Sequence, residues 1–303
     1  MNLKPQASNF LPHLAILGAN IIYGLNYSIA KDVMPAFIKP FGFILCRVMG
    51  ALILFTLVSS FYKEKIEKKD FMRLAICGFF GVAANQLMFF YGLNQTNPIN
   101  AGIIMTSNPI MVLLAAAFIL QSRITYTKIL GLVLGISGAL MILLFKKGFS
   151  FGSDTWVGDL FILLNSTSYA IYLVLVKPLM KKYSPITVIK WVFTFGFIYV
   201  IPFGFNQFTE INWATFTPDI WVKFGFVIVG TTFLAYLFNI YGLQKLNPSI
   251  VSTYIYLQPL IAAFYAIWVG KDSFTWIKLT AAILIFTGVY LVSKPVKVQT
   301  LNV

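Results

Sequence analysis

The stretch that decides the fold reads Tyr-Gly-Leu-Asn-Gln-Thr-Asn-Pro at residues 91–98 and opens a segment that runs to residue 143. It recurs 150 residues later, without a gap, as Tyr-Gly-Leu-Gln-Lys-Leu-Asn-Pro at 241–248, opening the segment 241–293. The identical pairs are Tyr91/Tyr241, Gly92/Gly242, Leu93/Leu243, Asn97/Asn247, Pro98/Pro248, Pro109/Pro259, Ala116/Ala266, Thr125/Thr275, Lys128/Lys278, Leu134/Leu284 and Gly138/Gly288. A Tyr-Gly-Leu-x3-Asn-Pro block that occurs twice and is followed each time by a proline at the same distance is poorly explained by chance. We infer an internal duplication with about 150 residues in each half.

The composition indicates a membrane protein. Of the 303 residues, 59% are hydrophobic and 11% are charged, and the mean hydropathy is +0.82. A soluble protein of this size needs a much more polar surface. The formal net charge of +14 would indicate a nucleic-acid partner in a soluble protein. Here the lysines lie between apolar runs, so positive cytoplasmic loops explain the charge, and we expect the lipid bilayer and no nucleic acid as a partner.

Few residues are suited to metal, redox or covalent chemistry. Cys46 and Cys77 both lie in apolar runs, so we expect two free thiols and no disulfide. His13 is the only histidine, which excludes a zinc or haem site built on histidine. The sequence contains no nucleophile elbow, Walker loop, dinucleotide fingerprint or metal cluster. We therefore expect no cofactor, no metal and no enzyme activity.

Hydropathy predicts an all-α membrane protein with ten transmembrane helices. A span needs about 20 apolar residues. The first apolar run, from about Leu11, is too long for a cleavable signal and should stay in the membrane. The predicted spans are 11–33, 41–62, 71–93, 99–120, 126–145, 156–176, 187–206, 219–242, 249–270 and 274–293. The connections between them are short, so neighbouring helices should form antiparallel hairpins.

The distribution of lysine and arginine predicts the orientation. If the N-terminus lies inside, 15 of these residues fall on the inner side and 7 on the outer side, and Arg47 falls within a span. An excess of positive residues marks the cytoplasmic side of a membrane protein. We expect a multi-pass protein of the bacterial cytoplasmic (inner) membrane with both termini in the cytoplasm.

Five spans in each half, residues 1–150 and 151–303, predict an inverted repeat. Because five is odd, the second copy must enter the membrane with the opposite orientation. Such a repeat has a pseudo-twofold axis in the membrane plane and a binding site near the midplane between the halves, which is a transporter architecture. The first helices of the two halves align at an offset of 146, where Tyr23 matches Tyr169, Lys31 matches Lys177 and Met34 matches Met180.

Two stripes of polar side chains lie inside otherwise apolar spans. The first helix carries Asn20, Tyr23 and Asn26 with Tyr27, and the sixth carries Asn165, Tyr169 and Tyr172 with Ser168, all at helical spacing. Polar groups are costly against lipid, so both stripes should face the interior of the bundle. They could line a substrate cavity with amide and phenol groups, or form interhelical hydrogen bonds that hold the bundle together. The superposition of the two stripes across the repeat favours the cavity.

The fourth and ninth helices carry matched prolines, Pro109 and Pro259, each directly after an amide residue, Asn108 or Gln258. Proline removes a backbone donor, frees a carbonyl one turn earlier and kinks the helix. A kink near the membrane centre in both halves is typical of a binding site, although neighbouring helices could equally satisfy a purely structural kink. Further candidate binding residues are Tyr254, four residues before Gln258, and the third-helix pair Asn85 and Gln86; Tyr236 matches Gln86, and Asn239 is a weaker candidate.

Arg47 is the one arginine inside a span. A buried guanidinium could bind a carboxylate or phosphate through two parallel hydrogen bonds. It could equally reach toward the interface or pair with Asp32, and we weigh a structural role higher. No carboxylate lies near a span centre, so the sequence does not support proton coupling.

These features together resemble the EamA-type transporters of the drug/metabolite transporter superfamily. The resemblance rests on ten spans, a five-plus-five inverted duplication, the Tyr-Gly-Leu-x3-Asn-Pro ending of the third helix in both halves, and the prolines Pro109 and Pro259. The residues that follow the two blocks, 99–102 and 249–252, depart from the alanine-rich pattern of the family. The resemblance covers 11–293. It implies a pocket between helices one, three, four, six, eight and nine, and it leaves the substrate open among amino acids, other metabolites and drugs.

We therefore expect a secondary transporter or exporter of small polar metabolites, with amino acids among the candidates, that works by alternating access as the two halves rock. The alternative is an integral-membrane enzyme such as a lipid or sugar transferase, which would need acidic or histidine residues near one membrane face. A membrane scaffold is a weaker alternative, because it gains nothing from midplane amides. The substrate, the coupling ion, the direction of transport and the oligomeric state, including a homodimer, stay open.

Overall fold

The computed structural model describes residues 10–62, 64–96, 98–122, 124–144, 156–268 and 275–293, and this part of the chain consists of helices joined by short connections. The helices are α1 (Phe10–Val33), α2 (Pro40–Ser59), α3 (Phe71–Gly78), η2 (Phe79–Ala83), α4 (Ala84–Gln95), α5 (Pro98–Met105), α6 (Asn108–Ile119), α7 (Tyr126–Leu144), α8 (Trp156–Met180), α9 (Pro185–Thr209), α10 (Pro218–Gly225), η5 (Phe226–Leu234), α11 (Ala235–Lys245), α12 (Pro248–Thr253), η6 (Tyr254–Tyr256), α13 (Leu257–Trp268) and α14 (Trp276–Ser293). Short 3-10 turns also form at Lys68–Asp70 and Trp213–Thr215.

These helices make ten membrane-length segments, as the hydropathy predicted. The third segment is α3, η2 and α4, and the eighth is α10, η5 and α11. The fourth is α5 and α6, interrupted at residues 106–107, and the ninth is α12, η6 and α13. Among the described residues, six helical stretches are long and apolar enough to cross a membrane unbroken. Of the other four, the first and fifth segments contribute the shorter apolar stretches Phe10–Asn26 and Tyr126–Ile142, and the fourth and ninth are interrupted, although together their parts span a comparable length.

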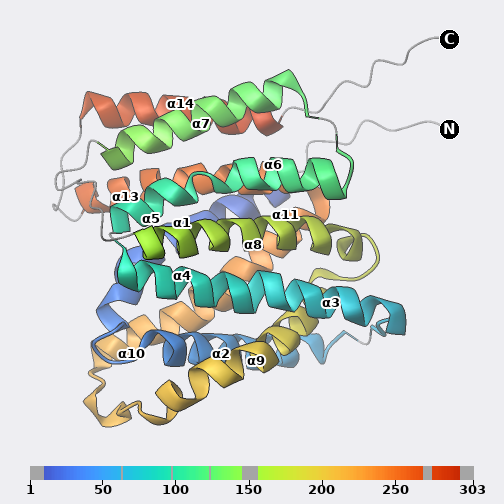
Figure 1. Cartoon of the computed structure of the whole chain (residues 1–303), viewed down its shortest axis with the longest axis vertical. Helices are drawn as coiled ribbons and strands as arrows, with labels where there is room; N and C mark the ends of the chain where they lie inside the picture. Colours follow the sequence, from blue (N-terminus) through green and yellow to red (C-terminus); the bar gives the residue numbers. More distant parts are fainter. Residues whose placement is uncertain are drawn as a thin grey trace.

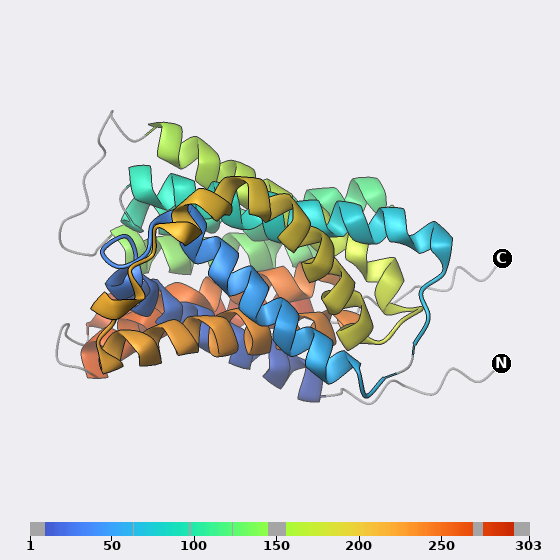
Figure 2. The ribbon, with the colours of Figure 1, turned by 90° about the horizontal axis from the view of Figure 1, so that it is seen from below.

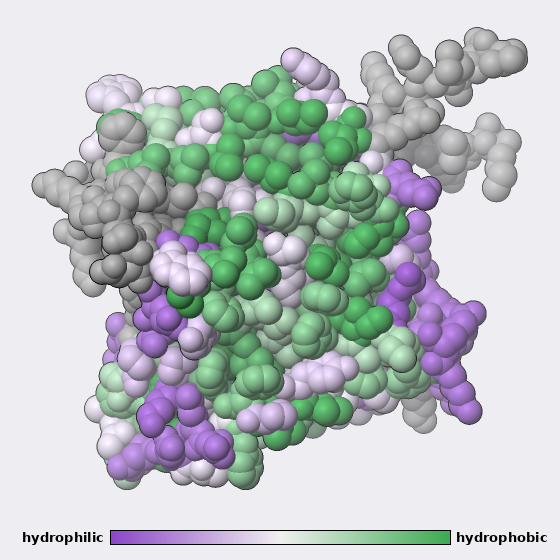
Figure 3. Space-filling view, viewed as in Figure 1, coloured by the Kyte–Doolittle hydropathy of each residue, from purple (hydrophilic) through white to green (hydrophobic). Residues whose placement is uncertain are grey.

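The outer surface is apolar where a bilayer would surround it. In Figure 3 hydrophobic residues form a band across the molecule, and hydrophilic residues gather at the two edges where the helices end. Large side chains in this surface are strongly exposed, including Phe118 at 84% and Phe264 at 73%. Water would oppose so large an apolar area, whereas lipid accommodates it. The chain is therefore a multi-pass membrane protein.

Equivalent helices of the two halves pack against each other on opposite faces of the bundle. The fifth helices, α7 and α14, form one face, and the second helices, α2 and α9, form the other (Figures 1 and 2). The first and third helices of both halves lie between these faces, where α4 packs on α8 and α11 packs on α1. Because α1 and α8 run in opposite directions (Figure 1), the duplication is an inverted one. The expected boundary near residue 150 lies outside the described residues.

The repeated Tyr-Gly-Leu block owes its glycine to close packing between the halves. A Cβ added at Gly92 of α4 would lie 2.8 Å from the carbonyl oxygen of Gly158 and 3.1 Å from Ile162 in α8. A Cβ added at Gly242 of α11 would meet Ile16 and would lie 3.2 Å from the carbonyl oxygen of Pro12 in α1. Each contact maps onto the other through the offsets of 150 and 146 residues. The third helix of each repeat therefore crosses the first helix of the other at a glycine.

Ion pairs join the two repeats at both edges of the bundle. At the edge where α1 begins, Lys182 Nζ lies 2.6 Å from both Glu67 Oε2 and Asp70 Oδ2. At the opposite edge, Lys39 Nζ lies 2.6 Å from Glu210 Oε2, and Lys223 Nζ lies 2.8 Å from Asp32 Oδ2. The described residues thus hold the halves together through ionic contacts above and below the apolar band.

Candidate functional site

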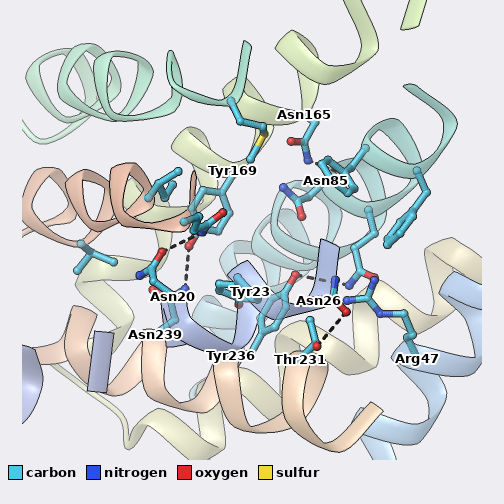
Figure 4. Close-up of a pocket in the computed structure, with 17 residues that line it drawn as sticks. Asn20, Tyr23, Asn26, Arg47, Asn85, Asn165, Tyr169, Thr231, Tyr236 and Asn239 are labelled. Carbon is cyan, nitrogen blue, oxygen red and sulfur yellow. Dashed lines mark hydrogen bonds between the residues drawn. The ribbon is translucent and has the colours of Figure 1, made fainter. Parts of the chain in front are cut away.

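A cavity of about 120 Å³ lies between the repeats, in the central layer of the bundle. Eight of the residues that line it were predicted from the polar stripes and the amide positions: Asn20, Tyr23, Asn26, Asn85, Gln86, Asn165, Tyr169 and Gln258. They come from α1, α4, α8 and α13, so helices of both repeats build the cavity (Figure 4). The volume is below the roughly 300–1,000 Å³ of pockets for drug-sized ligands, so the cavity suits a small solute.

Three predicted binding residues lie outside the cavity wall. Asn108 is fully buried, and its Nδ2 donates to the carbonyl oxygen of Ser166 at 3.0 Å. Tyr172 is buried against Gly81. Tyr254 directs its hydroxyl to Nδ1 of His13 at 2.7 Å. In each case a neighbouring helix takes the polar group or the ring, which is the interhelical role that the sequence left as the alternative.

The matched prolines lie at matched interruptions. Pro109 is in the first turn of α6, directly after the break that ends α5. Pro259 is in the first turn of α13, after the 3-10 turn η6. The preceding amides diverge, because Gln258 reaches the cavity and Asn108 does not.

Nine further residues line the cavity: Arg47, Phe89, Phe90, Met105, Thr231, Tyr236, Asn239, Val251 and Ile255. Arg47, Tyr236 and Asn239 were already weaker candidates from the sequence, and the repeat offers a further signal. Tyr236 is 150 residues from Gln86, and Ile255 is 150 residues from Met105, so each is the repeat partner of another wall residue. Most of the apolar members had no such signal. An apolar side chain in a membrane helix can face lipid, a neighbouring helix or a cavity, and its identity does not distinguish these environments.

Most hydrogen bonds in the wall connect the two repeats. Gln258 Nε2 donates to Asn20 Oδ1 at 2.8 Å, and Thr231 Oγ1 donates to Asn26 Oδ1 at 3.0 Å. Asn165 Nδ2 donates to the carbonyl oxygen of Asn85 at 2.7 Å. These bonds make the cavity wall a junction that changes whenever the repeats move relative to each other.

The contact between Gln86 and Tyr236 marks the pseudo-twofold axis. Gln86 Nε2 lies 3.5 Å from the Tyr236 hydroxyl, and the two residues occupy equivalent positions in the repeats. Residues related by a twofold axis meet where the axis passes between them, so the axis crosses the cavity here. Tyr23 packs edge-on against Tyr236 with ring centroids 6.4 Å apart, which adds an aromatic wall beside this contact.

Both third segments contain a π-helical turn next to the cavity. The turns are η2 (Phe79–Ala83) and η5 (Phe226–Leu234), and the 150-residue offset places the first inside the second. A π-helical turn inserts an extra residue and re-aims the side chains that follow, and such turns are frequent at functional sites. Here they precede or contain the wall residues Asn85, Gln86 and Thr231.

Arg47 enters the cavity from α2 and is 4% exposed. Its Nε donates to Thr232 Oγ1 at 3.0 Å, and its guanidinium carbon lies 5.0 Å from the ring centroid of Phe90. Neither structural role considered from the sequence is adopted. The side chain does not reach the interface, and Asp32 pairs with Lys223 instead.

Comparison with known proteins agrees with this architecture. The model of the EamA-like transporter family matches residues 10–144 and 156–294, one match in each repeat. A solved crystal structure superposes with a TM-score of 0.77 at 15% identity, covering 92% of this chain and 95% of its own, which shows a shared fold.

Relatives at the sequence level carry transporter names. The uncharacterized transporter YyaM of Bacillus subtilis (strain 168) is 24% identical over 305 residues, covering 96% of both chains. An uncharacterized transporter of Archaeoglobus fulgidus is 28% identical over 239 residues, 76% of this chain and 80% of its own. A Streptantibioticus cattleyicolor protein named "Probable terminal-alkyne amino-acid exporter" is 23% identical over 212 residues, 67% of each chain. With the family match across both repeats, this chain belongs to the EamA-like transporter family of membrane transporters.

Proposed function

We propose that the protein is a secondary transporter or exporter that moves small polar metabolites through the central cavity, and that it has no enzyme activity. The observation that carries the proposal is a buried cavity lined by amide and phenol groups of both repeats. A wall shared by two halves can bind a solute from one side and release it to the other when the halves rock. The amino-acid exporter among the relatives supports amino acids as candidate substrates.

The ion pairs at the two edges are suited to serve as gates. Exposed ion pairs contribute only about 0–1 kcal/mol each, so either edge can open at small cost. Rocking of one repeat against the other would break the pairs of Lys182 at one edge while those of Lys39 and Lys223 persist, and the reverse motion would do the opposite. The cavity would then face the two sides alternately.

The edge with Lys182 is assigned to the cytoplasm of a bacterial inner membrane. Lys181 and Lys182 lie at this edge, and α1 begins there (Figure 1). The positive-inside rule supports the assignment through the 15-to-7 excess of Lys and Arg. Reporter fusions at both termini test it, because an alkaline phosphatase reporter should be inactive and a green fluorescent reporter bright at each.

Counterflow in proteoliposomes tests transport directly. Vesicles containing the purified protein are loaded with an unlabelled amino acid, sugar, nucleoside or organic acid and diluted into the labelled form. We expect a transient, saturable accumulation of at least one labelled solute, which protein-free liposomes lack. If none of the solutes exchanges, the proposed function is contradicted.

A further inference from the structure

Arg47 holds a buried charge that no acidic side chain balances. Within the described ranges, no carboxylate lies within ion-pair distance of its guanidinium, and the lining of the cavity contains no acidic residue. A buried charge without a counter-charge is costly, and it is retained where a ligand supplies the missing partner. The charge is therefore the strongest chemical feature of the cavity.

The surroundings of Arg47 orient it without neutralising it. Thr232 Oγ1 donates to the carbonyl oxygen of Val227 at 2.8 Å within the π-helical turn η5, so its lone pair points at Arg47 Nε. The rings of Phe90 and Phe43 lie 5.0 and 5.6 Å from the guanidinium carbon. These contacts use one of the five N–H groups of the guanidinium. Among the described residues, no protein acceptor takes the Nη hydrogens, which are the pair that bind a carboxylate in parallel.

Acceptors without donors lie elsewhere in the same wall. Gln86 Oε1, Asn165 Oδ1 and Asn239 Oδ1 are buried and have no hydrogen-bond partner among the described residues. The orientation of Asn165 is firm, because its Nδ2 donates to a main-chain carbonyl, which accepts but cannot donate. A buried acceptor left unpaired costs about 1–3 kcal/mol. Asn165 Oδ1 therefore suits a ligand with N–H or O–H donors, and Gln86 and Asn239 present further amide groups in the same wall.

We propose that Arg47 binds the carboxylate of the transported solute and that the amide oxygens bind its amino or hydroxyl group. The assignment rests on the proposed transport function and narrows its substrate to small amino or hydroxy carboxylates. In Figure 4 Arg47 lies at one end of the group, beside Asn26 and Thr231, while Asn20 and Asn239 lie at the other end. The cavity is thus polarised, with a cation at one end and neutral amides along the rest.

The single cation selects a carboxylate over a phosphate ester. A phosphate monoester carries about −1.5 to −2 charges at neutral pH, so one guanidinium would leave net negative charge buried beside neutral amides. A carboxylate carries one charge, which one guanidinium balances. The cavity volume of about 120 Å³ also restricts the ligand to a small solute.

Matched solutes and variants test the proposal. Proteoliposome counterflow is measured with labelled L-alanine, L-valine and L-lactate, and competition is measured with L-alaninamide, L-valinamide and lactamide, in which the carboxylate is replaced. Ethanolamine phosphate, glucose and uridine complete the panel. We expect exchange of a carboxylate solute in the wild type, and at least about tenfold weaker competition by the corresponding amide, since a charge-assisted hydrogen-bond pair is lost.

Three variants separate binding from structure. Arg47→Met should lower exchange of the carboxylate at least about tenfold and bring acid and amide to similar competition, while the melting temperature in detergent does not fall, because an unbalanced buried charge is removed. Arg47→Lys keeps the charge but loses the planar pair of donors, so it should retain part of the discrimination. Arg73→Met removes an exposed arginine outside the cavity and should leave exchange and discrimination unchanged.

Each remaining outcome overturns the assignment in a recognisable way. Should Arg47→Met keep the wild-type discrimination, or lower the melting temperature while discrimination persists, Arg47 is structural and does not bind the substrate. If the wild type exchanges only glucose, uridine or the phosphate, the carboxylate assignment fails and the transport function stands. If the wild type exchanges no solute, both fail. Should Arg47→Met not fold, Arg47→Lys decides: a partial fall in the discrimination between acid and amide supports the assignment, and unchanged wild-type discrimination overturns it.

Discussion

Asn108 and Gln258 occupy equivalent positions in the two repeats, yet they meet different surroundings. Each is the amide before a matched proline, and each donates to the first helix of the other repeat. Gln258 bonds the side chain of Asn20 and lines the cavity, whereas Asn108 bonds the main chain of Ser166 and is sealed. The partners Asn20 and Ser166 are also equivalent, 146 residues apart.

The difference shows what a duplication conserves. The fold conserves the crossing of the helices and the direction of the donor. It does not conserve the length of the donor side chain or the size of its partner. Gln258 and Asn20 are both amides and bond beside the cavity, whereas the shorter Asn108 bonds directly to the main chain of Ser166, away from the cavity. A second asymmetry is stronger. The only cation of α9, the equivalent of α2, is Lys190, which lies over the Trp191 ring and does not line the cavity, so α9 contributes no counterpart to Arg47. The cavity is therefore chemically one-sided although its scaffold is nearly symmetric.

The largest expected effect concerns the two glycine crossings. Gly92→Ala should destabilise the protein by about 2–3 kcal/mol, because the added Cβ would lie 2.8 Å from the main-chain oxygen of Gly158, which cannot rotate away. Gly242→Ala should cost less, since its nearest neighbour is the flexible side chain of Ile16. Thermal unfolding of the two variants in the same detergent measures the difference. Equal melting temperatures, or a lower one for Gly242→Ala, would show that main-chain contact does not set the cost.

The next effect separates the two amides. Gln258→Ala should lower counterflow of the best wild-type solute about tenfold, equivalent to about 1.4 kcal/mol, because the bond to Asn20 and part of the cavity wall are lost. Asn108→Ala should instead lower stability by about 1–3 kcal/mol, because a fully buried hydrogen bond is lost. Its transport per folded molecule should stay near the wild-type value.

Both amide variants need transport and unfolding measured on one preparation. Transport is divided by the folded fraction, so that a loss of protein does not imitate a loss of binding. Equal transport defects in Gln258→Ala and Asn108→Ala, after this correction, would mean that Asn108 also contributes to the substrate site and that the proposed difference between the two amides is wrong.

The smallest effect compares the two ionic edges. Hydrogen bonds from Lys182 hold the pKa values of Glu67 and Asp70 below their ordinary values of 4.5 and 3.8. A lowered folded-state pKa stabilises the protein above the unfolded-state pKa, and this stability is lost as the pH falls through the lowered values. The melting temperature should therefore decline between about pH 5 and pH 3, and Lys182→Ala should reduce the decline.

The opposite edge supplies the control for this pH effect. Lys223→Ala removes ion pairs with Asp32 and Asp219, but it leaves those of Lys182 intact. The acid decline should persist in this variant. A decline that Lys182→Ala leaves unchanged would assign acid sensitivity to other carboxylates.

The amino-acid sequence alone determined the membrane class, the ten spans, the family and the inverted repeat. Each of these rests on a pattern that repeats along the chain: apolar runs long enough for a bilayer, and the Tyr-Gly-Leu block with its offset of 150 residues. Predicted span ends within the described ranges fall within four residues of the helix ends, and the predicted ends at 145, 270 and 274 lie outside those ranges. The polar stripes also identified five wall residues, and the amides at 85, 86 and 258 identified three more, because polar groups avoid lipid and therefore gather inside the bundle.

Only the tertiary structure decided which buried polar groups meet a cavity and which meet another helix. Asn108 and Gln258 cannot be distinguished by spacing, since the distance between two helices sets whether an amide is sealed or open. Arg47 could not be assigned either, because its surroundings come from Thr232 and Phe90, which are 185 and 43 residues away in the chain. A helical pattern reports the face on which a side chain lies, whereas the partners of that face are chosen by the packing of the whole bundle.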